Sequence, residues 1–324
     1  MSNEYTLDCG LPQGSIIGPR GFTLYSQYIA SIIRRHGLKY HIYADDVQIY
    51  MSLNPKVPGD AACAIFKLSS CVKEVRHWLT RNMLKLNDSK TEFFIAASQY
   101  NMTRLSKLSI KIGTAEVMPS TTVRNLGVVF DTSMTMSNHV TSLCTSVNFL
   151  LWNLSRIRRF IDEDACADAM RALILSKLDY ANSLLIGCRN KDIARLQRLQ
   201  NRAARIIFQV SRRHSPTLLL NSLHWLPIDR RIRFKTLLYV YKALNDLSPI
   251  YLTDCITTHV PSREGLRSTR DTTRLVIPRN NKAIGDGSFS ISGPKLWNEL
   301  PLVIRTAPTI NAFKRSLKTQ SLFS

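Results

Sequence analysis

Two adjacent carboxylates, Asp45 and Asp46, are the residues of this sequence whose type and spacing best suit chemistry. They lie between residues 40–43 and 47–50, two short runs rich in Tyr, Ile and Val. Because such residues favour β-strands whereas Asp favours turns, the pattern predicts a tight hairpin with both carboxylates at its tip. Carboxylates this close repel each other unless a cation lies between them. We therefore expect a Mg²⁺ site, with Mn²⁺ as the alternative ion; a solvated turn is the plain structural alternative.

The elements around this hairpin can be placed from composition and period. Residues 10–19 are dense in Gly and Pro, which indicates a loop that could let a nucleic-acid backbone approach closely; an ordinary helix-entry loop has the same composition. Apolar spacing predicts a helix over residues 22–33 that Gly37 ends, and a second helix over residues 61–82. Short strands are expected at residues 93–95, 108–112 and 123–131.

From about residue 137 the apolar period becomes helical. Helices are expected over residues 138–161, 163–180, 191–210 and 229–247, and a basic helix near 310–320. Asp229 is the expected N-cap of the fourth helix. Residues 248–290 are rich in Pro, Ser, Thr, Arg and Gly, which predicts an extended loop. His224, Trp225 and Trp297 are expected to be packing residues.

The third of these helices has two faces. One face is basic and consists of Arg195, Arg198, Arg202 and Arg205. The other is apolar and consists of Ile193, Leu196, Leu199, Ala203 and Ile206. The faces are separated by roughly 90° or more, so one can pack while the other contacts nucleic-acid phosphates. A merely solvated basic face is the alternative.

Charge is the strongest global feature. The 324 residues include 44 Lys and Arg against 23 Asp and Glu, which gives a net charge of +21. Residues 1–150 hold 15 basic and 10 acidic side chains, and residues 151–324 hold 29 and 13, so the excess lies mainly in the second half. This sign favours polyanions, either nucleic acid or an anionic membrane surface.

Several classes of protein are disfavoured. No run of eighteen apolar residues predicts a membrane-spanning helix, and residues 1–10 lack a secretion signal, so we expect an intracellular protein of the nucleus or cytoplasm. The seven scattered cysteines indicate reduced thiols. Cys255 and His259 have the spacing of half a zinc site, but no second half lies nearby in the sequence.

Four motifs, taken in chain order, resemble those of reverse transcriptases. They are Pro12-Gln13-Gly14-Ser15 with Gly18-Pro19 (the glycine loop), residues 43–46 (the catalytic hairpin), residues 82–87 with 90–92 (the next palm motif), and Leu126-Gly127 (the primer grip). The Gly-Ser form of the loop fits non-LTR (LINE-class) retrotransposons of the jockey-like type. Residues 178–185, 196–205, 224–227 and 296–298 are similar to the region downstream of the polymerase in that family.

The resemblance implies RNA-directed DNA synthesis by two-metal nucleotidyl transfer on an RNA template, with a DNA primer and deoxynucleotide triphosphates. Asp45 would be a catalytic metal ligand and Asp46 its close supporter. The implied template- and nucleotide-binding residues are Gln13, Gly14, Ser15, Tyr43 and Lys90, and the implied primer grip is Leu126 and Gly127.

The implied fold is α+β. It consists of a partial right-hand polymerase palm of antiparallel hairpins plus helices (residues 1–131), a helical thumb-like region (132–215) and a basic C-terminal region (216–324).

The sequence also departs from that family. A third carboxylate is needed from a strand before the glycine loop, but only eleven residues precede Pro12, and their acids are Glu4 and Asp8. We therefore expect a truncated segment that is inactive alone, with a partner chain as one source of the missing palm segment. The alternative is a non-catalytic, element-derived RNA- or DNA-binding protein. A membrane-surface protein is disfavoured because the arginine helix lacks a broad aromatic face.

Overall fold

The computed structural model describes residues 16–105, 107–113, 115–259, 273–280 and 283–321. The chain divides into two compact units after Val123, and each unit has a core of its own. The three-part division expected from the sequence, with boundaries after residues 131 and 215, stays a prediction.

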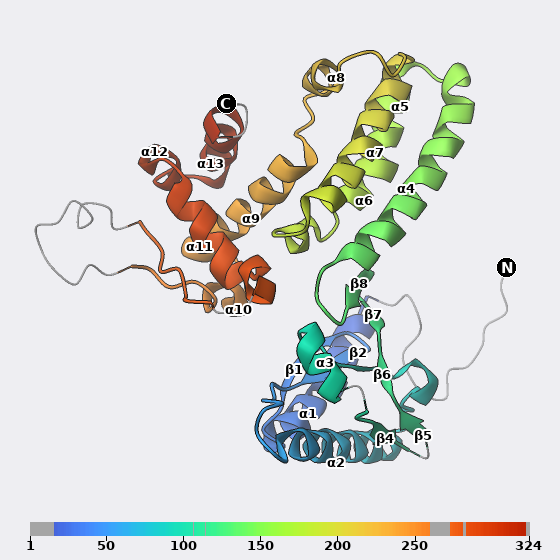
Figure 1. Cartoon of the computed structure of the whole chain (residues 1–324), viewed down its shortest axis with the longest axis vertical. Coiled ribbons are helices and arrows are strands. Elements are labelled where there is room, and N and C mark those ends of the chain that lie inside the picture. Colours follow the sequence, from blue (N-terminus) through green and yellow to red (C-terminus); the bar gives the residue numbers. More distant parts are fainter. Residues whose placement is uncertain (1–15, 106, 114, 260–272, 281–282, 322–324) are drawn as a thin grey trace, which may run out of the picture. The chain divides into compact units, whose positions relative to one another are not determined.

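The first unit is built around two helices and a hairpin (Figure 1). Helix α1 (Gly18–Arg35) packs on helix α2 (Asp60–Arg81), and strands β1 (Lys39–Tyr43) and β2 (Asp46–Tyr50) form the hairpin. Their shared core consists of Ile29, Ile32, Ile33, Leu38, Cys71 and Val75. The expected second helix is confirmed. Helix α1 begins at Gly18 instead of Phe22, because proline at a helix start lacks only an N–H that would be unpaired there anyway.

Short elements complete the first unit. β4 (Ile110–Ile112) pairs antiparallel with β5 (Ala115–Val117), and β3 (Phe93–Phe94) pairs parallel with β6 (Pro119–Ser120). The strands expected near these positions are confirmed. Helix α3 (Gln99–Leu105) was not expected, because Leu105 is its single buried residue and it therefore shows no apolar period.

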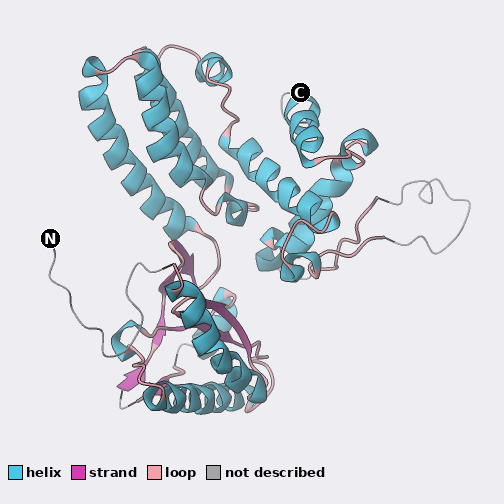
Figure 2. Cartoon of the chain, turned by 180° about the vertical axis from the view of Figure 1, so that it is seen from behind, coloured by secondary structure: helices cyan, strands magenta, loops and turns pink. Residues whose placement is uncertain are grey.

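The second unit begins with three helical rods that lie side by side (Figures 1 and 2). The first is α4 (Ser137–Ile157) with the 3₁₀ turn η2 (Arg158–Phe160). The second joins α5 (Glu163–Met170), the π-helical segment η3 (Arg171–Leu175) and α6 (Ser176–Asp179). The third is α7 (Asn190–Phe208). The three helices expected here are confirmed, and the π-helical segment is a local widening that the apolar period does not reveal.

A second core lies between α9 (Ile228–Leu244) and α11 (Phe289–Glu299). Tyr241 stacks on Phe313 of α13 (Ile310–Ser316) with ring centres 4.4 Å apart, and Trp297 lies 5.8 Å from Phe313. The expected basic helix near residues 310–320 and the packing roles of Trp225 and Trp297 are confirmed. His224 is exposed instead.

The remaining elements correct two expectations. Residues 248–290 hold the short helix α10 (Ile250–Thr253) and the 3₁₀ turn η6 (Ala283–Gly287), so they are not wholly extended. Pro227 takes the cap position of α9, and Asp229 lies in its first turn. The other short elements are η4 (Asn182–Leu185), α8 (Pro216–Ser222), α12 (Leu302–Arg305) and η7 (Leu317–Ser321). Within the described ranges, no helix combines the length and apolar character needed to span a membrane.

A buried arginine caps the third rod. The Arg158 guanidinium donates to the carbonyls of Ile206 (3.2 Å) and Ile207 (2.7 and 3.0 Å), and to that of Ile161 (2.7 Å). The last carbonyls of a helix have no partner within it and carry partial negative charge. Arg158 thus ties the ends of two rods together.

Replacing Arg158 with Met should lower the free energy of unfolding by about 3 kcal/mol, because several carbonyls stay buried without donors. Urea denaturation followed by circular dichroism measures this. The matched control is Arg159→Met, since Arg159 is exposed and should change stability by less than about 0.5 kcal/mol. Equal losses in the two variants would contradict the capping role.

A buried histidine should make the second unit sensitive to acid. His139 is buried on α4, and its Nδ1 accepts the Val129 N–H at 3.4 Å. Burial, with a smaller effect of Arg124, lowers the pKa of His139 from its ordinary 6.5. Because the folded state then favours the neutral ring, stability should be full above pH 6.5 and fall as pH drops below it.

The variant His139→Asn keeps an acceptor but does not titrate. Its free energy of unfolding should therefore change less between pH 7.5 and pH 5.5 than that of the parent chain, as measured by urea denaturation at each pH. Parallel pH profiles for parent and variant would show that His139 is not the titrating group.

Candidate catalytic hairpin and nucleic-acid interface

The paired carboxylates lie at the tip of a two-residue hairpin. β1 and β2 pair antiparallel, with Tyr43 opposite Asp46, so Ala44 and Asp45 form the turn. Ala44 has φ of 52°, as the first position of such tight turns requires. Asp45 is therefore at the tip and Asp46 begins β2, which confirms the expected hairpin.

The two faces of the hairpin differ. On the inner face, Tyr40, Ile42 and Ile49 pack on the core of the first unit. On the outer face, the His41 and Tyr50 rings stack at 5.2 Å, with a 3.0 Å hydrogen bond between Nε2 and the hydroxyl. Side chains alternate along strands, so the outer face also carries two members of the candidate set, Tyr43 and Asp46, and their neighbour Gln48. The inner face fixes the hairpin and leaves the carboxylates accessible.

The donor set at the tip fits a hard divalent cation. Asp45 and Asp46 are both exposed. Among the residues that the structure describes, neither carboxylate has an ion pair, and no cluster of three or more His, Cys, Asp or Glu side chains could hold a metal ion. Mg²⁺ commonly binds through one or two carboxylates and completes its shell with water and substrate phosphates. Asp45 and Asp46 thus supply the one or two carboxylate ligands that such an ion needs from the protein.

Other candidate residues of the first unit are placed only in part. Gln13, Gly14 and Ser15 lie outside the described residues. Lys90 is exposed at the end of the 3₁₀ turn η1 (Asp88–Lys90). An ion pair of 2.7 Å between Asp88 and Arg76 fastens this turn to α2. Lys90 thus extends from an anchored turn.

The Leu126-Gly127 pair forms a second tight turn. It joins β7 (Thr122–Asn125) to β8 (Val128–Asp131), and both turn residues have positive φ, 45° and 80°. The Tyr180 hydroxyl donates to the Leu126 carbonyl at 2.6 Å. A Cβ on Gly127 would lie 3.5 Å from the Tyr180 ring. The turn is therefore held by a residue that sequence reasoning gave no role, because a contact across 54 positions leaves no local pattern.

The basic stripe of α7 is confirmed in geometry. Arg198 and Arg202 are exposed, and Arg195 and Arg205 are half-buried. Arg202 donates to the Asn148 side chain of α4 at 3.1 Å. Arg195 lies 3.3 Å from Asp192 and donates to Thr141 at 3.1 Å. The stripe thus runs beside α4. Of its two exposed members, Arg202 is hydrogen-bonded to α4, whereas no such bond is seen for Arg198 among the described residues.

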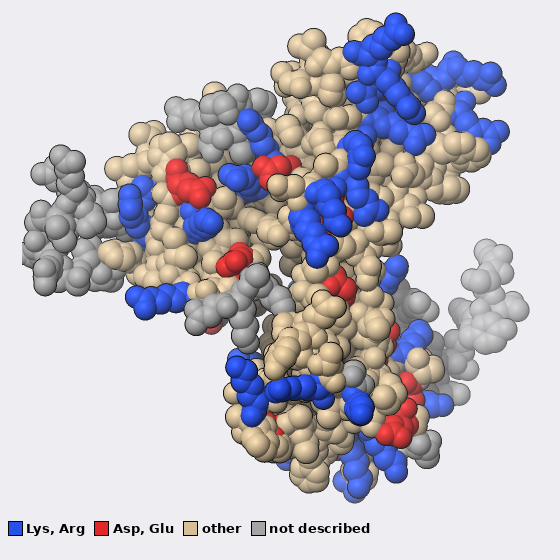
Figure 3. All heavy atoms as spheres, viewed as in Figure 1, with Lys and Arg blue, Asp and Glu red and all other residues tan. Residues whose placement is uncertain are grey.

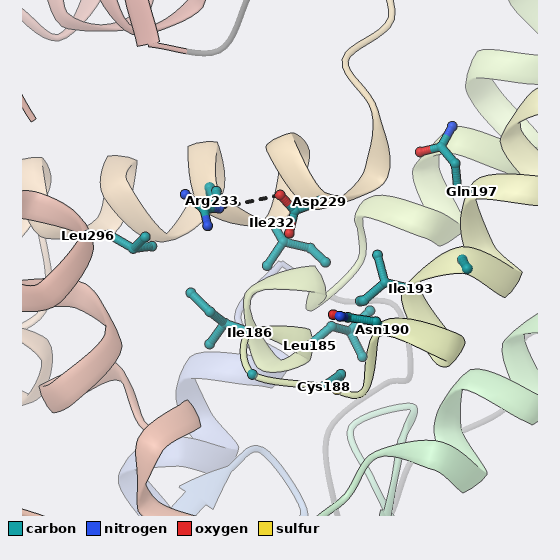
Figure 4. A pocket seen from close by; sticks show the side chains of 12 residues that line it. Leu185, Ile186, Cys188, Asn190, Ile193, Gln197, Asp229, Ile232, Arg233 and Leu296 are labelled. Carbon is teal, nitrogen blue, oxygen red and sulfur yellow. Dashed lines mark ion pairs between the residues drawn. The ribbon is translucent and has the colours of Figure 1, made fainter. Parts of the chain in front are cut away.

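A cavity of about 490 Å³ lies apart from these candidates, within the second unit. Figure 4 shows apolar side chains such as Ile186, Ile193 and Leu296 around it, with the Asp229–Arg233 ion pair (3.3 Å) at one side. Burial, aided by Asp192 and Asp131, raises the pKa of the Cys188 thiol to about 11. That thiol is protonated at neutral pH and is a poor nucleophile. Nothing in this lining supports catalysis.

Comparisons with known proteins agree with the geometry of the hairpin. Residues 2–130 match the family model described as reverse transcriptase (RNA-dependent DNA polymerase). The chain is 26% identical over 221 residues to a probable RNA-directed DNA polymerase from transposon X-element of Drosophila melanogaster. That match covers 64% of this chain and 22% of the relative, so the chain corresponds to about a fifth of the relative's length. No solved structure matches.

The family match includes the carboxylate hairpin and ends within β8, and the transposon relative extends the likeness beyond it. Residues 2–130 are therefore similar to the reverse transcriptase (RNA-dependent DNA polymerase) family, and the relative supports the non-LTR kind that the motifs of this chain resemble.

Proposed function

We propose that this chain is part of an RNA-directed DNA polymerase of a non-LTR retrotransposon, with Asp45 and Asp46 as its metal-binding carboxylates. The observation that carries the proposal is the exposed carboxylate pair on a hairpin whose inner face is anchored in a core. Asp45 and Asp46 would hold Mg²⁺, and the two-metal chemistry supplied there would be activation of the primer 3′-hydroxyl and stabilisation of the leaving pyrophosphate. Mn²⁺ would serve in place of Mg²⁺.

The other candidate residues take supporting roles. Tyr43 shares the outer face with Asp46 and would contact the nucleotide or the template. Lys90 would contact phosphate, and Gln13, Gly14 and Ser15 would line the template path. Leu126 and Gly127 would hold the primer end.

The helical part of the chain would grip the nucleic acid. The stripe of Arg195, Arg198, Arg202 and Arg205 would neutralise backbone phosphates, which makes binding fall with salt. In this proposal residues 132–215 act as a thumb and residues 216–324 as a basic accessory region, inside the cell.

We further propose that the chain alone does not polymerise. Within the described ranges no third carboxylate joins Asp45 and Asp46, and two-metal transfer needs a clamp on both the attacking and the leaving oxygen. A partner chain would supply the missing palm ligand.

A non-catalytic RNA- or DNA-binding protein is the second candidate function. The observation that favours it is the concentration of charge in residues 151–324, which hold 29 basic and 13 acidic side chains. Both functions predict binding that weakens with salt. They differ at the hairpin, because only the polymerase requires a metal at Asp45.

Replacing Asp45 with Ala should weaken divalent-metal binding at the hairpin at least tenfold, because one of two carboxylate ligands is lost. The measurement is Mn²⁺-induced broadening of the NMR signals of Tyr43 and Val47. Glu116→Ala is the control, since Glu116 is also an exposed carboxylate on a hairpin of the first unit. If parent, Asp45→Ala and Glu116→Ala broaden alike, the hairpin is no metal site and the binding-protein function is preferred.

Primer extension on an RNA template with Mg²⁺ tests the activity of the chain alone. We expect no synthesis, together with salt-sensitive RNA binding that Asp45→Ala leaves unchanged. Synthesis by the parent that Asp45→Ala abolishes would confirm the polymerase and show the expected inactivity to be wrong.

Replacing Tyr180 with Phe should loosen the Leu126-Gly127 turn. Loss of a hydrogen bond worth about 1 kcal/mol should speed hydrogen exchange of the turn amides roughly fivefold. Binding of a primer–template duplex should weaken several-fold if the turn holds the primer. Tyr25→Phe is a matched control, because the Tyr25 hydroxyl donates to the Asn82 carbonyl at 2.7 Å in the first unit. Equal effects of the two variants on duplex binding would argue against a primer-holding turn.

A further inference from the structure

A row of aromatic side chains lies exposed along the first rod of the second unit. The exposed fractions are 62% for Phe149, 49% for Trp152 and 72% for Phe160. Their spacing of three and eight residues places them on one side of the rod. The opposite side of α4 already packs in the core, since Val147, Leu151 and Leu154 are buried there. The aromatic row therefore contributes little to the core and is available to a ligand.

Arginines lie against two of these rings. The Arg156 guanidinium is 4.8 Å from the centre of the Trp152 ring, and that of Arg159 is 4.6 Å from the centre of the Phe160 ring. Both are at cation–π distance. The row thus combines flat rings with planar cations that can bind a phosphate and stack on a base.

The row adjoins the arginine stripe of α7. The hydrogen bond from Arg202 to Asn148 of α4 joins the two helices at the level of Phe149. Residues 137–160 contain no Asp or Glu, and the one acidic residue of α7, Asp192, is buried. Figure 3 shows Lys and Arg gathered over the helices of this unit, with few acidic side chains among them. We call Phe149, Trp152, Arg156, Phe160, Arg198 and Arg202 the ring-and-arginine face.

We propose that the ring-and-arginine face binds single-stranded nucleic acid, with unpaired bases stacked on Trp152 and its neighbours and phosphates paired with the arginines. In a duplex the base faces are already stacked, so exposed rings gain nothing from it, whereas a single strand offers every base as a flat partner. The row from Phe149 to Phe160 is roughly 16 Å long at 1.5 Å per residue. That length accommodates ~5 nucleotides at 3.4 Å each.

The positive charge of this face disfavours an uncharged partner, and burial of the apolar face of α4 disfavours a lipid surface. A protein partner would have to be acidic to match this face. A helix that lies on a membrane needs a broad apolar face free to enter it, and the apolar face of α4 is buried in the core. The proposal builds on the nucleic-acid role proposed for this half of the chain, but it does not depend on the metal site.

Fluorescence anisotropy of the full chain with labelled 12-nucleotide strands of RNA and of DNA, and with a blunt 12-base-pair duplex, tests the proposal at fixed salt. The parent should bind at least one single strand about tenfold more tightly than the duplex. Trp152→Ala should weaken single-strand binding by about ten- to a hundredfold and leave duplex binding within about twofold. Comparison of RNA with DNA identifies which strand the face prefers.

Two further variants separate stacking from general damage. Phe149→Ala should also weaken single-strand binding selectively. Tyr251→Ala removes an equally exposed ring (63%) on α10 and should change nothing. Trp152 is also the most exposed tryptophan, since Trp225 and Trp297 are buried and Trp78 packs on the first core, so a bound strand should quench its fluorescence.

Several results would overturn the proposal. They are equal affinity for strand and duplex, equal losses for Trp152→Ala and Tyr251→Ala, or binding to anionic phosphatidylserine vesicles without binding to any oligonucleotide. Asp45→Ala separates this test from the previous one. If the hairpin binds no metal, the proposed polymerase function is wrong, but selective single-strand binding by the ring-and-arginine face is unaffected. If the chain shows no preference for single strands, the ring-and-arginine proposal is wrong, but the metal site is unaffected.

Discussion

Burial of one carboxylate constrains the whole helical unit. Asp192, in the first turn of α7, is 2% exposed. An unpaired buried charge costs several kcal/mol, so it persists only with partners. Ser137 of α4 donates to it at 2.8 Å, and Arg195 lies 3.3 Å away. This pairing fixes which side of α7 faces α4. Because each residue turns the helix by about 100°, Arg198 and Arg202 are then directed to the surface.

The hairpin is arranged in the same way: one face packs on the core of the first unit, and the other is largely exposed. Its short alternating strands could be predicted from composition, because β-branched and aromatic residues flank the turn-forming Asp45 and Asp46. The helical rods and the arginine stripe could be predicted as well, since a period of 3.6 is local information. What these predictions share is that every residue involved is close in the sequence.

Features that depend on distant residues could not be predicted. The bond from Tyr180 to the Leu126 carbonyl joins positions 54 apart, and no pattern near either residue announces it. The early start of α1 was hidden because Gly18 and Pro19 suit a loop as well as a first helical turn. The exposed row at Trp152 was missed for another reason. Aromatic residues in a helix usually pack, and only the structure shows that the other side of α4 already fills the core.

The stack of Tyr241 on Phe313 also bears on how the chain folds during synthesis. The core around α9 includes Trp297 and Phe313, which leave the ribosome long after α9 itself. Until then, the buried face of α9 has no cover and exposes Val240 and Tyr241 to solvent. Such transient apolar surface promotes aggregation and chaperone capture. A stalled or prematurely ended message would therefore yield a product whose second core is open, even though its three helical rods are complete.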